Sequence, residues 1–393
     1  MRESGFKATY HINRLVAENY KNLGPLDVSF GSLNILIGPN SSGKSNLVNI
    51  FRFLENASLP SVDEVSSFDK AIMQLGGSDI LDKTVKRPGQ VNLEFYLSPL
   101  PPEEVQSRLR LTLLFVPGNR FPVIYREDVA VERRKGEGFN DKMLFRQNQH
   151  EQETIEGAIL AAGPIPLYNL LGSFSHWHFY NANSMNLKRI REAEPKVGQG
   201  DRYLTASGEN LTLVLHNLME DSLEFEERIN QAMQGIWPLT RRIRTVFAGQ
   251  LSLAVQWYIA DTPEPFYLRE MSDGLVRMLC WATILHSPQL PALLVIEEPE
   301  MGIHVAWLEV LAHWIKNASL KTQIIISTHS PDLLDHFTDE VENVLVFSAP
   351  ERDTGHFAIN RLTQESVASW LQEGWKLGDL YRVGDPSVGG WPW

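Results

Sequence analysis

The sequence predicts an α/β fold, because three short apolar segments each end in polar residues that can do chemistry. Residues 34–37 read as a buried strand and lead into the glycine-rich run 38–46. Residues 292–296 form a second apolar strand that ends in two glutamates, and residues 323–326 form a third that ends in Ser-Thr-His. Strands that deliver polar side chains at their carboxyl ends are typical of α/β nucleotide-binding domains.

Residues 38–45 spell G-x-x-x-x-G-K-S, the pattern of a phosphate-binding loop. Its glycines let backbone N–H groups turn inward around phosphate oxygens, and the helix expected over 47–54 adds the partial positive charge of its N-terminus. Lys44 can reach the terminal phosphates, and Ser45 can place its hydroxyl on Mg²⁺. The residues expected to bind the nucleotide here are Gly38, Pro39, Asn40, Ser41, Ser42, Gly43, Lys44, Ser45 and Asn46.

The segment before the loop reads as two antiparallel strands that feed the loop strand. Their apolar clusters lie at 12–16 and 26–30. The turn between them contains Asn19, Tyr20 and Lys21. Tyr20 is available there to stack on a nucleotide base, or the segment is a plain surface turn.

Downstream of the loop, four strand-like runs predict an antiparallel sheet attached to the nucleotide domain. They lie at 91–97, 109–116, 122–125 and 129–133. A polar, charged linker is expected to follow and to run to about residue 153.

Residues 154–245 are expected to form a mainly helical insert, since 211–218 and 223–233 have helical spacing of apolar residues. His176 and His178 stand two apart in an aromatic cluster and could bind a metal ion. No carboxylate or cysteine completes such a site nearby, so packing is the favoured interpretation.

The bulk composition describes an ordinary globular chain of 393 residues with a formal net charge of -12. No run of about 18 apolar residues occurs, so no membrane span is expected. The N-terminus lacks the apolar core of a signal peptide, and the single cysteine, Cys280, excludes an internal disulfide. A cytoplasmic protein is expected.

The negative charge argues against a broadly basic nucleic-acid surface, but two local basic clusters could contact nucleic-acid phosphates. In an acidic protein such clusters are more often solvated faces or salt-bridge partners. The clusters are Lys188, Arg189 and Arg191, and Arg241, Arg242 and Arg244.

The acidic run after the strand 292–296 suits an Mg²⁺-nucleotide site. Glu297 would hold the metal ion through water, and Glu298 would orient or deprotonate the water that attacks the γ-phosphate. Glu300 is expected to support the following turn. His329, at the end of the next strand, can hydrogen-bond the γ-phosphate.

A second helix start precedes the acidic strand. Ser272 is a fitting N-cap for a helix over 275–285, and the exposed N–H groups beside Gly274 form an anion site. Because the chain already has one phosphate-binding loop, a second start of this kind makes most sense if it serves a nucleotide held by another subunit.

This set of motifs resembles the ATP-binding-cassette (ABC) ATPases, and within them the soluble SMC, RecF and OLD-like branch. Residues 38–45 match the Walker A motif, 271–274 the signature, 293–298 Walker B and His329 the switch histidine. Residues 300–304 resemble the D-loop region that follows Walker B in this branch.

The resemblance implies an ABC-type head of the P-loop NTPase class, α/β in fold, with an antiparallel β subdomain and a helical insert. The implied division places Walker A and the β subdomain in 1–153, the insert in 154–245, and the other motifs in 246–393. No long heptad stretch separates the two halves, and about 60 residues follow the switch histidine, too few for the TOPRIM nuclease domain of OLD proteins.

The family's site is shared between two subunits that sandwich two ATP molecules with Mg²⁺. By resemblance, Ser272 and Gly274 would come from the second subunit. The sequence departs from the family in placing Glu297 at the usual aspartate and in starting the signature with Met271. Both Gln74 and Gln90 could be the Q-loop glutamine, and Gln74 is the expected additional metal ligand.

The function implied is an ATPase that dimerises or oligomerises around ATP and controls an effector on a separate chain. Resemblance to OLD-like ATPases of bacterial anti-phage systems suggests a nuclease or a toxin as that effector. The alternative is a RecF-like DNA-repair ATPase that clamps DNA, for which the basic clusters are the only support.

Overall fold

The computed structural model describes ten stretches of the chain, and these belong to two compact units. The described residues are 9–58, 67–100, 105–118, 123–134, 139–148, 174, 176–192, 202–248, 252–348 and 356–390. The first unit comprises 1–178, 341–374 and 380–393, and the second comprises 179–340 and 375–379.

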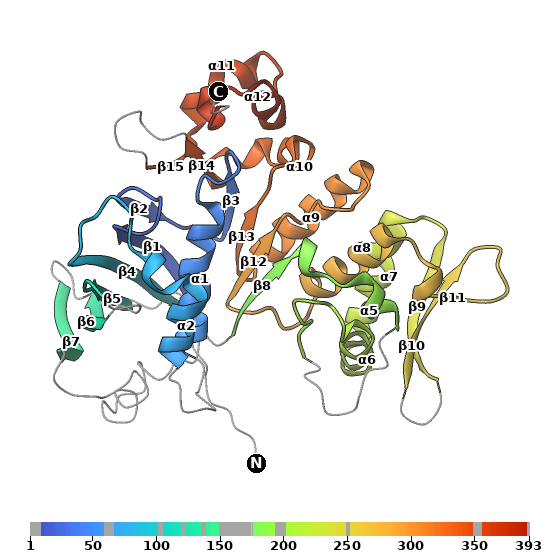
Figure 1. Ribbon diagram of the computed structural model, residues 1–393. Coiled ribbons are helices and arrows are strands. Elements are labelled where there is room, and N and C mark those ends of the chain that lie inside the picture. Colours follow the sequence, from blue (N-terminus) through green and yellow to red (C-terminus); the bar gives the residue numbers. More distant parts are fainter. Residues whose placement is uncertain are drawn as a thin grey trace. The chain divides into compact units, whose positions relative to one another are not determined.

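The first unit contains a six-stranded antiparallel sheet, in blue to green at the left of Figure 1. Its strands follow the order β2-β1-β4-β5-β6-β7. Along β4, alternate residues from Val91 to Leu97 are fully buried, which is the period of two that a half-buried strand requires. The strands are β1 (Thr9–Glu18), β2 (Leu26–Ser29), β4 (Gly89–Leu100), β5 (Val105–Phe115), β6 (Val123–Arg134) and β7 (Phe139–Asn148).

Two details of this sheet correct the sequence-based expectation. The runs at 122–125 and 129–133 belong to one strand, β6. The expected charged linker is wrong over 139–148, where β7 pairs with β6 as the last strand of the sheet among the described residues. An end strand needs a partner on one side only, so its backbone can pair even when the sequence is polar. The rest of the expected linker lies outside the described residues.

The first unit also holds a smaller sheet segment that carries the phosphate-binding loop. Strand β3 (Leu33–Ile37) is buried throughout and runs parallel to β14 (Val344–Ser348). Strand β15 (Ala358–Arg361) pairs with β14 in the antiparallel sense. Because β3 is buried, it reads in the sequence as a continuous apolar run.

Helix α1 (Lys44–Ser58) follows the loop and packs against α2 (Ser67–Leu75). Its buried side chains recur at helical spacing and form one apolar face. Phe51, on this face, makes edge contacts with Phe30 and Trp177. The buried residues of α1 are Lys44, Leu47, Val48, Ile50, Phe51, Phe53, Leu54 and Ala57.

The turn at Asn19 to Lys21 is not the surface turn expected. Asn19 and Lys21 have positive φ angles of 60° and 50°, and Tyr20 forms a β-bridge with Leu81. Tyr20 is only 1% exposed, and burial raises the pKa of its hydroxyl. A ring so enclosed cannot stack on a nucleotide base, so that interpretation of Tyr20 is wrong.

The second unit contains the acidic strand β12 (Leu293–Glu297), which runs parallel to β13 (Gln323–Ser327). Strands β11, β10 and β9 form a separate antiparallel sheet in that order. Helix α7 packs against both α6 and α8. The remaining elements are α5 (Leu187–Glu192), α6 (Leu211–Asp221), α7 (Leu223–Ile236), β9 (Thr240–Phe247), β10 (Leu253–Ile259), β11 (Phe266–Tyr267), α8 (Asp273–Leu285), α9 (Leu308–Ser319) and α10 (Pro331–Asp335).

The described residues of the helical insert expected over 154–245 do not form a compact unit of their own, since those from 179 onward belong to the second unit. The expected boundary at 245 falls inside β9, and residues 177–181 form strand β8 (Trp177–Asn181). Helices α6 and α7 pack on α8, which begins within the segment 271–274 predicted as the signature, so they share one core with it. Residues 154–173 lie outside the described part of the chain.

The C-terminal part of the chain forms two helices and a short turn. Helix α11 (Gln364–Gln372) is capped by Thr363, whose side chain accepts from the Ser366 N–H. Helix α12 (Leu377–Val383) has its first residues in the second unit and the rest in the first. A 3-10 turn, η6 (Pro386–Val388), follows. Among the described helices, none has the length and apolar character needed to span a bilayer.

Candidate nucleotide-binding site

The phosphate-binding loop has a backbone that only glycine can adopt at two positions. Gly38 and Gly43 have φ angles of 141° and 101°. A Cβ atom at Gly38 would lie 2.5 Å from the carbonyl oxygen of Phe347, and one at Gly43 would lie 2.4 Å from a methyl group of Leu23. Gly38 is therefore required both by its backbone angle and by the backbone that faces it, and Gly43 is required by its backbone angle.

Lys44 is the first residue of α1 and is 6% exposed. Its Nζ donates to the carbonyl oxygens of Gly38 and Pro39, each at 2.8 Å. The ammonium group thus lies inside the loop, held by charge-assisted hydrogen bonds. The first turn of α1 contains no acidic residue, so nothing in that turn offsets the positive end of the helix dipole. These features fit a bound phosphate group.

The loop is tied to the β1–β2 turn by two asparagines. The Asn46 amide donates to Oδ1 of Asn22 at 2.7 Å, and the Asn22 amide donates to the carbonyl of Ser41 at 3.0 Å. Beside them opens a pocket of about 580 Å³, within the range of ligand sites. Asn22 and Asn46 line one part of it, and His356 and Asp82 line another.

The pair of Asp82 and His356 is polar and partly buried. Burial acts to raise the pKa of Asp82, but hydrogen bonds from Thr84 and His356 outweigh it and the pKa is lowered. Asp82 is therefore a carboxylate at neutral pH, held by Thr84 and His356 at the edge of this pocket.

The structure does not bring Gln74 to Ser45. Oε1 of Gln74 accepts a hydrogen bond from the Asn56 amide at 2.7 Å. Asn56 follows Ser45 by 11 helical residues, which corresponds to roughly 16 Å along α1. Gln74 thus lies beside the far end of the helix, and its expected place in the magnesium site is corrected. For Gln90, the structure shows a contact of the backbone, since its carbonyl accepts from the Asn19 amide at 2.9 Å.

In the second unit, the acidic strand ends in a strained residue. Glu297 is the last residue of β12 and is 9% exposed. Glu298 follows it with a φ angle of 51°, in the left-handed region that costs a residue with a Cβ atom free energy. Its N–H donates to the Ser327 carbonyl at 2.8 Å, which holds the turn against the end of β13. Strain of this kind is found where a side chain must point in one direction.

Glu300 connects the acidic turn to the histidine segment. Its Oε1 accepts from the Thr328 hydroxyl at 2.7 Å and from the His329 N–H at 3.1 Å. Burial raises the pKa of Glu300, with these hydrogen bonds acting in the opposite direction. Glu300 supports the turn, as its sequence position suggests, and it also fixes the backbone of His329.

One residue at this site was missed by the sequence reasoning. The Asn183 amide donates to Oε2 of Glu298 at 2.8 Å. Asn183 lies in a 3-10 turn, η2 (Ala182–Ser184), directly after β8, and the guanidinium of Arg277 donates to the Ala182 carbonyl. In the sequence, the only feature that points to Asn183 is the pattern Asn-x-Asn at 181–183, at the end of an aromatic strand. By itself this pattern indicates only a turn.

We expect Asn183→Ala to lower the turnover number for ATP hydrolysis about tenfold and to change KM less than twofold, because a hydrogen bond to a charged group is lost at the candidate base. Phosphate release at saturating ATP measures the effect. Asn317→Ala, at an exposed amide on α9, is the matched control. An unchanged turnover number in Asn183→Ala would remove the residue from the mechanism.

The signature segment begins helix α8. Ser272 is its N-cap and accepts from the Leu275 N–H at 3.4 Å, and its side chain remains exposed. Gly274 packs closely, since a Cβ atom there would lie 3.0 Å from the ring of Trp307. Arg191 donates to the Met271 carbonyl at 2.9 Å and to the Asp273 carboxylate at 2.6 Å. Arg191 therefore holds the signature segment.

Most of the basic residues considered for nucleic acid are engaged within the second unit. Besides Arg191, three arginines contact side chains of their own unit, so these contacts weaken the case for a phosphate-binding surface. The contacts are Arg189 with Glu209, Arg242 with Glu226, and Arg244 with Gln256 and Tyr258.

The pKa of His178 fits the interpretation that His176 and His178 pack in the aromatic cluster. Burial, and secondarily the neighbouring His176, lowers the pKa of His178 to about 4, so His178 is neutral at pH 7. In the part of the chain that the structure describes, no three His, Cys, Asp or Glu side chains gather to hold a metal ion by themselves. Mg²⁺ commonly takes one or two protein ligands plus phosphate oxygens and water, so a nucleotide-bound Mg²⁺ does not require such a cluster.

Comparison with known proteins identifies the family. The model of a family described as "AAA domain, putative AbiEii toxin, Type IV TA system" matches residues 33–335, well over half of the chain. The chain belongs to this AAA-domain family. As a member of it, the protein is a P-loop NTPase of the ATPase type, which confirms that part of the prediction.

The fold of this AAA-domain protein is also that of known ATPase heads. An SMC head bound to the C-winged helix domain of ScpA is 14% identical, covers 91% of this chain and 99% of its own, and superposes with a TM-score of 0.54. An SMC head with an extended coiled coil, bound to the C-terminal domain of ScpA from Pyrococcus furiosus, is 14% identical, with coverages of 93% and 99% and a TM-score of 0.52. The predicted α/β head fold is confirmed. No curated protein sequence matches the chain.

Proposed function

We propose that the protein is a magnesium-dependent ATPase that dimerises around ATP and so controls an effector on a separate chain. The observation that carries the proposal is the state of Glu298: it stands in a left-handed backbone directly after β12, and Asn183 holds its carboxylate. A carboxylate held in this way is suited to orient an attacking water.

The loop residues 38–46 would bind the phosphates through backbone N–H groups, with Lys44 turning from the loop carbonyls to the terminal phosphates. Ser45 and Glu297 would hold Mg²⁺, whose charge would offset that of the phosphates. The pocket beside Asn22 and Asn46 has room for the nucleoside. His329, with its backbone fixed by Glu300, would donate to the γ-phosphate.

The dimer proposal rests on the signature. Ser272 and Asp273 are exposed at the start of α8, a helix of 13 residues whose N-terminus can bind an anion. Ser272 and Gly274 would contact the nucleotide of the other subunit. Arg191 and the packing of Gly274 on Trp307 keep this segment rigid, which limits the entropy lost on binding.

A mixing experiment tests the shared site. Ser272→Arg subunits would have an intact loop without a usable signature, and Lys44→Ala subunits would have the reverse. We expect each variant alone to be inactive and an equimolar mixture to recover about a quarter of wild-type phosphate release, since one complete site forms in each mixed dimer. A mixture no more active than its components, although light scattering shows ATP-dependent dimers, would exclude a site shared in this way.

The effector is proposed to be a nuclease or a toxin in anti-phage defence. The family's own description names a putative toxin of a type IV toxin–antitoxin system, and the similar SMC heads are bound to domains of ScpA. The RecF-like alternative predicts salt-dependent DNA binding strengthened by ATP. The engaged arginines leave it without a specific observation in its favour.

A further inference from the structure

We infer that the C-terminal segment 380–390 is part of the phosphate-binding loop's support, with Tyr381 as a positioning residue for the Gly38 carbonyl of the loop. The inference rests on the proposed binding of ATP at this loop. Every contact used lies within the first unit.

The two side chains share one acceptor. The Tyr381 hydroxyl donates to the carbonyl oxygen of Gly38 at 3.1 Å, and Nζ of Lys44 donates to the same oxygen at 2.8 Å. Tyr381 is 7% exposed, so its hydroxyl bond is formed inside the protein. A residue 343 positions away in sequence therefore contacts the first glycine of the loop.

The segment after Tyr381 packs on the same part of the loop. Gly389 has a φ angle of 101°, and a Cβ atom there would lie 3.1 Å from the Phe347 carbonyl and 3.7 Å from Cα of Gly38. The Phe347 carbonyl is also the atom that leaves no room for a side chain at Gly38. Val388 is fully buried beside this contact. Gly38 and Gly389, which are far apart in sequence, thus both pack against the carbonyl oxygen of Phe347.

The segment has its own internal order. Asp385 donates its N–H to the Leu380 carbonyl at 3.0 Å, and Gly390 donates to the Asp385 carbonyl at 3.0 Å. The Asp385 carboxylate accepts from the Ser387 N–H and hydroxyl at 2.9 and 2.6 Å. These bonds close the turn, so the position of Tyr381 is determined by a compact support.

Nucleotide binding changes what this support does. When Lys44 turns to a phosphate, the Gly38 carbonyl loses its bond to the ammonium group, and a buried carbonyl left without a donor costs free energy. The Tyr381 hydroxyl keeps that carbonyl bonded. Its hydrogen bond therefore stabilises the loop more when ATP is bound than when it is absent.

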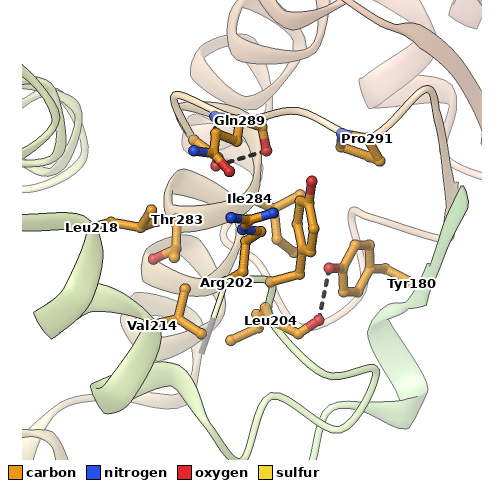
Figure 2. Close-up of a pocket in the computed structure, with 11 residues that line it drawn as sticks. Tyr180, Arg202, Leu204, Val214, Leu218, Thr283, Ile284, Gln289 and Pro291 are labelled. Atoms are coloured by element: carbon orange, nitrogen blue, oxygen red, sulfur yellow. Dashed lines mark hydrogen bonds between the residues drawn. The ribbon is translucent and has the colours of Figure 1, made fainter. Parts of the chain in front are cut away.

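Tyr381→Phe tests this difference. We expect it to weaken ATP binding about fivefold, measured by calorimetric titration, and to change the melting temperature without nucleotide by less than about 2 °C. The matched control is Tyr180→Phe, whose hydroxyl donates to the Leu204 carbonyl at 2.8 Å in the second unit (Figure 2). Tyr180 lines a cavity of only about 10 Å³, room for about one water, and its variant should lower the melting temperature without changing ATP affinity.

A double-mutant cycle without nucleotide separates this inference from the proposed function. In a Lys44→Ala background, the Tyr381 hydroxyl carries more of the hydrogen bonding of the Gly38 carbonyl. We expect Tyr381→Phe to lower the melting temperature at least twice as much there as in the wild-type background. Gly389→Ala, which forces the segment away from Phe347, should weaken ATP binding in the same direction as Tyr381→Phe.

Additive effects in the cycle, together with equal ATP affinities of wild type and Tyr381→Phe, would overturn the inference and leave the proposed function standing. Non-additive melting temperatures in the cycle, found together with a wild-type protein that binds no ATP, would support the shared Gly38 carbonyl and overturn the proposed function.

Discussion

Replacing Glu298 with glutamine will lower the rate of ATP hydrolysis by at least about 100-fold and leave ATP binding intact. The amide is close to the carboxylate in size and cannot accept a proton from water at neutral pH. The backbone strain at Glu298 and the contact with Asn183 are retained, because glutamine can still accept from the Asn183 amide. The loss therefore falls on the chemical step.

The same variant tests the dimer. If ATP closes the site and hydrolysis opens it, Glu298→Gln will accumulate as an ATP-bound dimer, visible by light scattering as a doubling of mass. Glu309→Gln, at an exposed carboxylate in the first turn of α9, is the control and should hydrolyse ATP like the wild type. Normal hydrolysis in Glu298→Gln, or a slow monomer with ATP bound, would contradict the proposal.

Replacing Lys44 with alanine will reduce ATP affinity by at least about 100-fold, because a buried, charge-assisted donor to the phosphates is lost. It will also destabilise the protein without nucleotide, by about 1–3 kcal/mol. The second effect follows from this structure, in which Nζ bonds the Gly38 and Pro39 carbonyls and Lys44 is 6% exposed. Both carbonyls would lose a donor.

Urea unfolding without nucleotide and calorimetric titration with ATP measure the two effects separately. Lys188→Ala removes an exposed lysine of the second unit and should change neither quantity. If Lys44→Ala were more stable than the wild type, the cost of burying the ammonium group would exceed the value of its hydrogen bonds. If it bound ATP normally, the loop would not be the nucleotide site.

The loop and the acidic strand could be predicted because their chemistry requires particular residues at fixed spacing. Gly38 and Gly43 are dictated by backbone angles, and β3 and β12 are buried, so they appear as apolar runs. The helix start at Ser272 could be predicted for the same local reason, since Ser272 caps the helix that it precedes. The strand β7 could not, because its pairing with β6 depends on a neighbour and not on its own composition.

The sequence by itself determined the class of the fold and the order of the chemical groups along it. Tertiary structure decided which other side chains contact these groups: it placed Asn183 on Glu298 and Arg191 on the predicted signature segment, buried Tyr20, and separated Gln74 from Ser45. It also brought Tyr381 to the phosphate-binding loop. A motif of eight residues is specified by the local backbone, whereas a single asparagine, arginine or tyrosine acquires a role only from the atoms that the folded chain places within hydrogen-bond distance.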